Sequence, residues 1–387
     1  MNRAPTPIDP KLLERIQGAI DDIRAGKMVI LVDDEDRENE GDFCMAAELV
    51  TPEAVNFMAM HGRGLICLTM TEAQVDRLQL PLMAAPGRGG PPLGTAFTVS
   101  IEARTGVSTG ISAADRAHTM RVAARPSCRP EDLVTPGHVF PLRARDGGVL
   151  VRTGQTEGSV DLARLAGLEP AGVICEIMRE DGTMARMPDL EKVAAQHGIR
   201  IVTVADLIQY RLITERLVTR LAEGPVQLDG MSEGWRAAVY GNAIDGRQFL
   251  ALHKGDLSAD EPALCRVHGG STFADVFAST PKDGGRNLRA AIGAIESEGR
   301  GVILYVPSRG TMKQELESYW LATNPVPSTV GDGPIRELGL GCQVLHDLGV
   351  RRLKLLTNNP LKMAGLHGFG LEIVARLPLT PRAPNAR

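Results

Sequence analysis

Apolar residues recur every three or four positions near the start of the chain, which predicts an amphipathic helix. They are Leu12, Leu13, Ile16, Ile20 and Ile23. Asp9 and Pro10 come just before them, a pair typical of the N-cap and first position of a helix, and Gly26 is expected to end it. The next apolar run, residues 28–32, is short and rich in branched side chains, so it predicts a buried strand that ends at Asp33.

Helical and strand-like patterns alternate through the rest of the chain. The pattern predicts helices at 190–196, 205–212, 286–298 and 341–348, and strands at 199–204, 248–255, 301–306 and 353–359. This interleaving predicts an α/β (α+β) fold in two domains, because 387 residues exceed the usual size of a single core.

The boundary between the domains is expected where the periodic pattern weakens. Gly224, Pro225, Gly230 and Gly234 lie close together there. We therefore predict a first domain at 1–212, a linker at 213–232, a second domain at 233–378 and a disordered tail at 379–387, whose sequence is polar and rich in proline.

Charge and composition narrow the class of partner. Lys and Arg number 43 against 47 Asp and Glu, and no basic run marks a nucleic-acid surface, so we expect a small-molecule partner. No apolar stretch approaches the roughly 20 residues that span a bilayer, and the N-terminus lacks the apolar core of a secretory signal. We expect a cytoplasmic protein without membrane contact. Its six scattered cysteines match neither a disulfide framework nor a paired metal site.

The run DDEDRENEGD at 33–42 has seven carboxylates and one arginine directly after the first predicted strand. Such a run is most often a solvated acidic turn. At a strand end, however, one or two carboxylates can hold a hard cation such as Mg²⁺, and crowded carboxylates favour a bound cation or proton. The loop can thus supply both metal ligands and acid/base groups.

Several segments together resemble one family, in its order and at similar spacing. They are DDEDRENEGD, GRGLICL (62–68), TGISAADRAHT (109–119), PGHVFPL (136–142), GQTEGSVDL (154–162) and GVICEIM (172–178). Through them the first domain resembles 3,4-dihydroxy-2-butanone 4-phosphate synthase of riboflavin biosynthesis. The resemblance implies a carbon–carbon lyase that converts ribulose 5-phosphate to the butanone phosphate and formate. It also implies Mg²⁺ or Mn²⁺, two ions per site, and a homodimer formed through the first domain.

The resemblance also implies the role of each site residue. Catalysis would fall to His138, Glu176 and Asp42, and the metal ligands would be Glu38 and Gln155. The residues that contact the sugar phosphate would be Arg37, Glu38, Asp42, Cys67, Arg152, Thr156 and Glu176. Arg152 suits the phosphate because a guanidinium matches its oxygens.

Other interpretations of these residues remain open. A lone histidine is usually structural, but His138 lies in a turn restrained by Pro136, Gly137 and Pro141, which favours a functional role. Cys67 is either a mobile-loop contact or part of an apolar strand. The hydroxyls and amides of 106–112 could hold phosphate, although such loops are often only turns.

Gln155 is the main difference from the family's motif, because the family has a metal-binding histidine at this position. A glutamine can ligate through its amide oxygen, and both side chains are neutral when they bind, so Mg²⁺ should be tolerated. Glutamine cannot offer an imidazole nitrogen, so we predict a site shifted away from transition metals. The other expected site residues match those of the family, which favours an active enzyme.

The second domain resembles GTP cyclohydrolase II without its chemistry. The resemblance lies in LALHKGD (250–256), CRVH (265–268), DVFAS (275–279), GRGVILY (299–305), GLGCQVLHDLGV (339–350) and LLTNNPLK (355–362). The three zinc-binding cysteines of the family correspond to Ser271, Lys282 and Gly284. The catalytic arginine corresponds to Thr311, and Pro334 replaces an aspartate, although Arg336 remains. We therefore expect neither GTP hydrolysis nor zinc binding.

Cys265 and His268 do not restore a zinc site, because an odd spacing on a strand puts them on opposite faces. The domain would then serve as a scaffold for the dimer or as a nucleotide sensor that reuses Thr357 and Lys362. A bifunctional enzyme and an inactive regulator are the alternatives for the whole chain.

Overall fold

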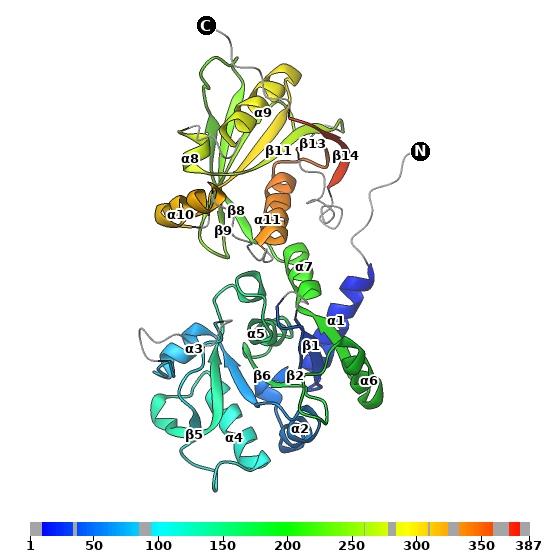
Figure 1. The fold of residues 1–387 in the computed structure, drawn as a ribbon, viewed down its shortest axis with the longest axis vertical. Helices are drawn as coiled ribbons and strands as arrows, with labels where there is room; N and C mark the ends of the chain where they lie inside the picture. Colours follow the sequence, from blue (N-terminus) through cyan, green and yellow to red (C-terminus); the bar gives the residue numbers. More distant parts are fainter. Residues whose placement is uncertain are drawn as a thin grey trace. The chain divides into compact units, whose positions relative to one another are not determined.

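The computed structural model describes residues 10–33, 37–84, 94–258, 260–277, 284–308, 310–323, 333–358 and 371–379. The chain divides into two compact units, Lys11–Tyr210 and Arg211–Arg387. Each unit contains one seven-stranded sheet covered by helices (Figure 1). This confirms the two-domain α/β prediction. No helix in the described part of the chain is both long and apolar enough to cross a membrane.

The sheet of the first unit has the strand order β4-β5-β3-β6-β2-β1-β7. Its strands are β1 (Val29–Val32), β2 (Gly41–Ala46), β3 (Cys67–Met70), β4 (Ile101–Ala103), β5 (Leu133–Arg143), β6 (Ala171–Glu176) and β7 (Arg200–Thr203). β1 and β2 pair antiparallel, with Val32 opposite Gly41, so Asp33 and the described residues 37–40 of the acidic run lie between the two strands.

The helices of the first unit lie on both faces of this sheet (Figure 1). They are α1 (Pro10–Arg24), α2 (Pro52–Phe57), α3 (Glu72–Arg77), α4 (Ala113–Ala124), α5 (Gln155–Leu165), α6 (Met187–His197) and α7 (Val204–Thr214), with a π-helical turn, η2, at Met58–Gly62. Residues of α2, α4 and α6 pack with Phe43 and Leu68 in one core cluster.

Helix α5 lies against the opposite face of the sheet, and it can do so because small residues meet there. A side chain at Gly158 would come within 2.7 Å of Leu31 Cδ2. The Ser159 hydroxyl lies 2.7 Å from that of Thr69, which also accepts from the Gly172 amide. This close packing fixes the start of α5, and with it Gln155 and Thr156, beside the start of β2.

The second unit contains a sheet with the order β14-β13-β11-β12-β10-β9-β8. Its strands are β8 (Val218–Pro225), β9 (Trp235–Asn242), β10 (Gln248–Lys254), β11 (Ala263–Gly269), β12 (Gly301–Val306), β13 (Arg352–Leu356) and β14 (Glu372–Leu377). Its helices are α8 (Thr272–Asp275), α9 (Gly284–Glu298), α10 (Met312–Thr323) and α11 (Gly333–Asp347). Cys265 and His268 both lie on β11, as predicted.

The linker predicted at 213–232 is wrong. Strand β8 lies inside this segment and pairs with β9 from Val218 opposite Asn242 to Pro225 opposite Arg236. Of the glycines that suggested a boundary, Gly224 lies in β8 itself, and Gly230 and Gly234 lie in the β8–β9 connection with positive φ angles of 70° and 96°. They therefore mark a turn inside the second domain.

The predicted tail begins with a packed residue. Leu379 is 5% exposed and belongs to the core cluster around Trp235, and its amide donates to the Asn358 side chain over 2.7 Å. The remaining tail, 380–387, lies outside the described residues, as do Lys282 and Lys362. The other predicted helices and strands are present, with α11 beginning earlier than expected.

Candidate functional site

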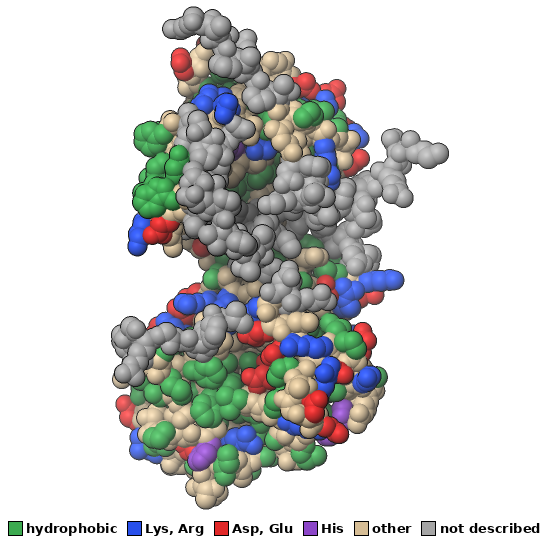
Figure 2. Space-filling model, in the orientation of Figure 1, with side chains coloured by type: hydrophobic (Ala, Val, Ile, Leu, Met, Phe, Trp, Pro, Cys, Tyr) green, Lys and Arg blue, Asp and Glu red, His purple; other side chains and the backbone are tan. Residues whose placement is uncertain are grey.

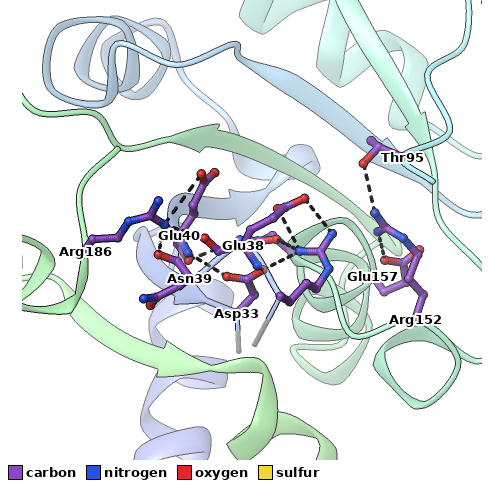
Figure 3. A network of polar contacts seen from close by, with 10 residues as sticks. Asp33, Glu38, Asn39, Glu40, Thr95, Arg152, Glu157 and Arg186 are labelled. Carbon is purple, nitrogen blue, oxygen red and sulfur yellow. Dashed lines mark hydrogen bonds and ion pairs between the residues drawn. The ribbon is translucent and has the colours of Figure 1, made fainter. Parts of the chain in front are cut away.

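The acidic loop is organised around the buried carboxylate of Asp33 (Figure 3). Its Oδ1 accepts from the Glu40 amide over 2.8 Å, and its Oδ2 accepts from the Glu38 amide over 3.2 Å and from Arg37 Nη1 over 2.6 Å. One side chain thus folds the loop back on itself. Asp34, Glu35 and Asp36 lie outside the described residues.

Arg37 joins the loop to the start of helix α5. Its Nη1 donates to Glu38 Oε2 and to Gln155 Oε1, each over 2.9 Å. Gln155 Nε2 donates in turn to the Glu40 carbonyl over 3.4 Å, and the residue is only 5% exposed. The oxygens of Glu38 and Gln155 therefore converge on one cationic nitrogen.

Arg186, at the N-cap of α6, holds the other side of the loop (Figure 3). Its Nη1 donates to the carbonyl of Glu38 over 2.6 Å and also to that of Asn39. Glu40 lies 3.8 Å from the same guanidinium. No sequence pattern singles out Arg186, because it lies far along the chain from the acidic run.

Asp42 and Glu176 lie opposite each other on β2 and β6. Burial, followed by the charges of Glu176 and Asp33, raises the pKa of Asp42 well above its usual range. Burial likewise raises the pKa of Glu176, whose Oε2 accepts from the Leu65 amide over 2.8 Å. Asp42 Oδ1 is buried and has no hydrogen-bond partner among the described residues.

Cys67 lies beside this pair as the first residue of β3, opposite Ile174 of β6. It is 2% exposed, and burial together with the Glu176 and Asp42 charges raises the pKa of its thiol. The position agrees with the apolar-strand interpretation of Cys67 more than with a mobile-loop contact. A side chain at Gly64 would come within 2.6 Å of Glu176 Oε2, so the segment before β3 leaves space for that carboxylate.

Arg152 is already paired within the chain. Its Nη1 donates to the buried Glu157 over 2.6 Å, and its Nη2 donates to Thr95 Oγ1 over 3.0 Å (Figure 3). A phosphate would therefore compete with or join an existing carboxylate. Thr156 follows Gln155 in the first turn of α5 and is 5% exposed.

His138 lies on β5, apart from the acidic residues. Its Nδ1 is 2.7 Å from Glu102 Oε2 of β4, and its side chain is 45% exposed. Within the described part of the chain, no hydrogen bond or ion pair joins His138 to Asp42 or Glu176. β3 separates β5 from β6, so the backbones of His138 and Glu176 lie about 10 Å apart at two strand spacings.

The loop at 106–112 differs from a free phosphate site. The Ser108 amide and hydroxyl and the Gly110 amide all donate to the Asp115 carboxylate, over 3.1, 2.8 and 3.0 Å. These donors are therefore engaged by Asp115 in the first turn of α4. Sequence reasoning missed this use of Asp115, and it also missed Glu102 as the partner of His138.

The donor set fits a hard divalent cation. The carboxylate of Glu38 and the amide oxygen of Gln155 already meet at one positive group, whereas no three His, Cys, Asp or Glu side chains among the described residues are grouped to hold a metal ion. All these donors are oxygens, which suit Mg²⁺. Asp33, Glu38, Glu40, Asp42 and Glu176 outnumber the nearby Arg37 and Arg186, so the cluster also favours a cation on charge alone.

In the second unit, Ser271 stands at the position of the first expected zinc ligand and is hydrogen-bonded to other protein groups. Ser271 Oγ donates to Glu315 Oε1 over 2.9 Å, and the Ser271 amide donates to Asp275 over 2.8 Å. Asp275 also binds His268 Nε2 over 3.0 Å and the Tyr305 hydroxyl over 3.1 Å. Burial, followed by the charge and hydrogen bond of Asp275, raises the pKa of Tyr305 to about 12.

Thr311 has a helix-capping role in place of the catalytic arginine. Its hydroxyl accepts from the Gln314 amide over 3.3 Å, and its own amide donates to the Gln314 side chain over 2.9 Å. These reciprocal bonds cap the start of α10.

Comparison with known proteins identifies one family for each half of the chain. Residues 17–210 match the family described as 3,4-dihydroxy-2-butanone 4-phosphate synthase, and residues 220–378 match GTP cyclohydrolase II. The riboflavin biosynthesis protein RibBA of Aquifex aeolicus is 50% identical over 94% of this chain and 92% of its own. A rice protein described as a probable bifunctional riboflavin biosynthesis protein is 46% identical over 96% of this chain and 70% of its own.

Among solved structures, the chain is similar to RibBX of A. baumannii, described as a two-domain 3,4-dihydroxy-2-butanone 4-phosphate synthase. The identity is 40%, the TM-score is 0.75, and the match covers 95% of this chain and 99% of RibBX.

The raised pKa of Asp42 predicts a pH-dependent gain of stability for Asp42→Asn. A buried carboxyl with a raised pKa stabilises the fold at low pH and loses this contribution as the pH rises through its folded-state value. The asparagine avoids that loss. In chelator, urea unfolding should therefore show Asp42→Asn increasingly more stable than the unmodified protein as the pH rises above the usual aspartate range, about 4. The exposed Asp146→Asn is the control, and equal pH dependence of both variants would contradict this account.

Proposed function

Because the chain belongs to the 3,4-dihydroxy-2-butanone 4-phosphate synthase family, we propose that it converts ribulose 5-phosphate to the butanone phosphate and formate. The observation that supports this most is the buried pair Asp42 and Glu176 at the end of the acidic loop. Because the pKa values of both carboxyl groups are raised, each group keeps its proton to a higher pH than an ordinary carboxyl group does, which suits groups that must take up and return protons.

Glu38 and Gln155 would hold a divalent cation, Mg²⁺ or Mn²⁺. Bound there, the cation would act as a Lewis acid for neighbouring substrate oxygens. A second ion per site would draw on Asp42, whose Oδ1 has no partner among the described residues. The Arg37 guanidinium now occupies the point at which the Glu38 and Gln155 oxygens meet. When the metal ion binds there, Arg37 would move toward the substrate.

The chain's own groups provide the remaining chemistry. Asp42 would accept a proton next to the substrate carbonyl, and Glu176 and His138 would transfer protons as the carbon skeleton rearranges. Arg152 would bind the phosphate with Glu157 keeping its guanidinium in place, and Thr156 would contact the substrate from the start of α5. Cys67 would pack beside the sugar from the base of the site.

The first test is formate release from ribulose 5-phosphate by the full chain with Mg²⁺, with Mn²⁺ and after chelation. Turnover should require the metal, and Glu38→Ala should abolish it because a ligand carboxylate is lost. Glu176→Gln should lower kcat by about 100- to 10,000-fold, the range for losing a general acid or base. Glu180→Ala, with a side chain 94% exposed, is the matched control and should keep full activity.

Gln155→His in the same assay separates the alternatives. If Gln155 serves as a metal ligand, both proteins should be active. The histidine variant should then gain activity with transition metals relative to its activity with Mg²⁺. An unmodified chain that is inactive until histidine is introduced would overturn the proposal and favour an inactive regulator.

For the second domain, we propose a scaffold without GTP cyclohydrolase II activity. Ser271 is engaged by Glu315, and Thr311 caps α10, so two positions of the expected chemistry have structural uses. RibBX is described as a two-domain synthase and supports this view, whereas the bifunctional description of the rice relative supports the alternative. A nucleotide sensor would instead have to use Thr357, whose amide donates to Leu377.

This proposal predicts that the full chain leaves GTP unchanged when Zn²⁺ is supplied and retains no stoichiometric zinc after dialysis. Zinc is quantified by mass spectrometry and GTP by chromatography, with synthase turnover of the same sample as evidence of correct folding. GTP loss accompanied by one bound zinc per chain would establish the bifunctional alternative. Calorimetric binding of GTP without its loss would favour the sensor.

We also propose a homodimer formed through the first unit. Figure 2 shows apolar side chains gathered on one face of this unit. The exposed large apolar residues of the first unit include Met60, Leu65, Leu82, Met83 and Ile111, at 43–56% exposure. Leu65 lies next to Glu176, so such an interface would reach the site.

Sedimentation of the full chain should give a two-chain species. Met60→Asp should weaken it, because a charge would be buried in the interface. Val276→Asp is the matched control, since Val276 is 70% exposed but belongs to the second unit. A monomeric unmodified chain, or dissociation by the Val276 change alone, would contradict a dimer formed through the first unit.

A further inference from the structure

His138 has a carboxylate partner that lies outside the acidic cluster. Glu102, on β4, is 8% exposed, and its Oε2 lies 2.7 Å from His138 Nδ1. The histidine ring reaches solvent, with 45% of its side chain exposed, while the glutamate side chain is 11% exposed. The pair thus has a buried, fixed end and an accessible end.

The backbone around Glu102 is shaped to hold this carboxylate against the ring. The pairing of β4 with β5 shifts register between Ile101 and Glu102. Gly137 packs directly on the Ile101 backbone, where a Cβ would overlap it, and its amide donates to Ser100 Oγ over 3.1 Å. These contacts set the position of His138 relative to β4.

A second glycine closes the other side of the carboxylate. Gly110, with φ of 88°, lies so near that a Cβ there would overlap the Glu102 carboxyl group. The Gly110 amide is held by Asp115 over 3.0 Å, so the 106–112 loop is anchored in this position. The 106–112 loop, which could have been a phosphate site, therefore packs over the Glu102 carboxyl group.

The contact has a chemical consequence for the histidine. An ionised carboxylate can only accept hydrogen bonds, so His138 Nδ1 must carry the proton that joins it to Glu102. Nε2 is then the nitrogen that remains free to accept or return a proton. Glu102 Oε1 is buried without a hydrogen-bond partner among the described residues, so no other donor competes for this carboxylate.

We propose that Glu102 is a positioning residue that fixes the Nδ1-protonated tautomer of His138 and presents Nε2 to the substrate. This inference rests on the proposed function only in its use of His138 as a proton-transfer group. The tautomer itself is a property of the free protein and can be measured without turnover.

The first measurement is the two-bond ¹H–¹⁵N spectrum of the imidazoles in the full chain, where the two ring nitrogens of a neutral histidine give distinct shifts. The signals of His138 are identified as those lost in His138→Asn. They should report the Nδ1–H tautomer in the unmodified protein. In Glu102→Gln the signals should show a mixture of tautomers or the Nε2–H form, because the amide can donate to Nδ1 as well as accept from it.

The second measurement is steady-state kinetics. Glu102→Gln should lower kcat about 10- to 100-fold, the range typical of changing the partner of a functional histidine, while KM stays nearly constant. Glu102→Asp keeps the carboxylate and should recover part of the loss. Glu131→Gln, at an exposed position, is the control, and the thermal transition of each variant shows whether it is folded.

The outcomes separate the two levels of the proposal. If His138→Asn keeps full activity, the role of His138 in the proposed function fails, whatever the tautomer. If His138 is required but Glu102→Gln keeps both the kcat and the Nδ1–H tautomer, the inference about Glu102 is overturned. A raised KM with an unchanged kcat would also overturn it, because it would place Glu102 in substrate binding.

Discussion

The acidic site depends on the burial of one carboxylate, Asp33. Its side chain is fully buried and accepts from two backbone amides of its own loop and from Arg37. Together with the bonds from Arg186 and Gln155 to the Glu38 and Glu40 carbonyls, these bonds hold the loop against the repulsion of its like charges. The residue that resembles a plain strand end is thus the one that gives the loop its shape.

This arrangement has an energetic cost that the rest of the unit offsets. Asp42 and Glu176 are held against each other in the sheet, and burial disfavours the charged form of both. Close packing of α5 through Gly158, and the core on the other face of the sheet, provide stability that the site does not. Such a division is typical of functional sites, where local charge repulsion is retained for chemistry.

Local signals in the sequence predicted much of the fold. The helix at Pro10–Arg24 follows from a proline and a periodic apolar face, while Asp9, its expected cap, lies outside the described residues. The strand at Gly301–Val306 follows from an unbroken apolar run. The linker was wrong because glycines mark turns inside a domain as readily as boundaries between domains, and only the pairing of β8 with β9 distinguishes the two.

The candidate site also has features that the sequence reveals and features that only the folded chain reveals. The acidic run and its position after a strand are visible in the sequence, but its partners are tertiary: Gln155 is 118 residues from Arg37, and Arg186 is 148 residues from Glu38. The partnership of His138 with Glu102 spans 36 residues and depends on a register shift between strands that no periodicity reveals. The family motifs drew attention to His138 but not to Glu102, its hydrogen-bond partner in the fold.

Gln155 shows how a substitution can be accommodated at such a site. Its amide accepts from Arg37 on one side and donates to the Glu40 carbonyl on the other, so it links α5 to both ends of the loop without adding charge. A neutral histidine also has one acceptor and one donor, but they are fixed on a rigid ring. In the proposed function, the glutamine would therefore keep the charge of the site unchanged, and it would differ from a histidine in the donor atom that it offers to a cation.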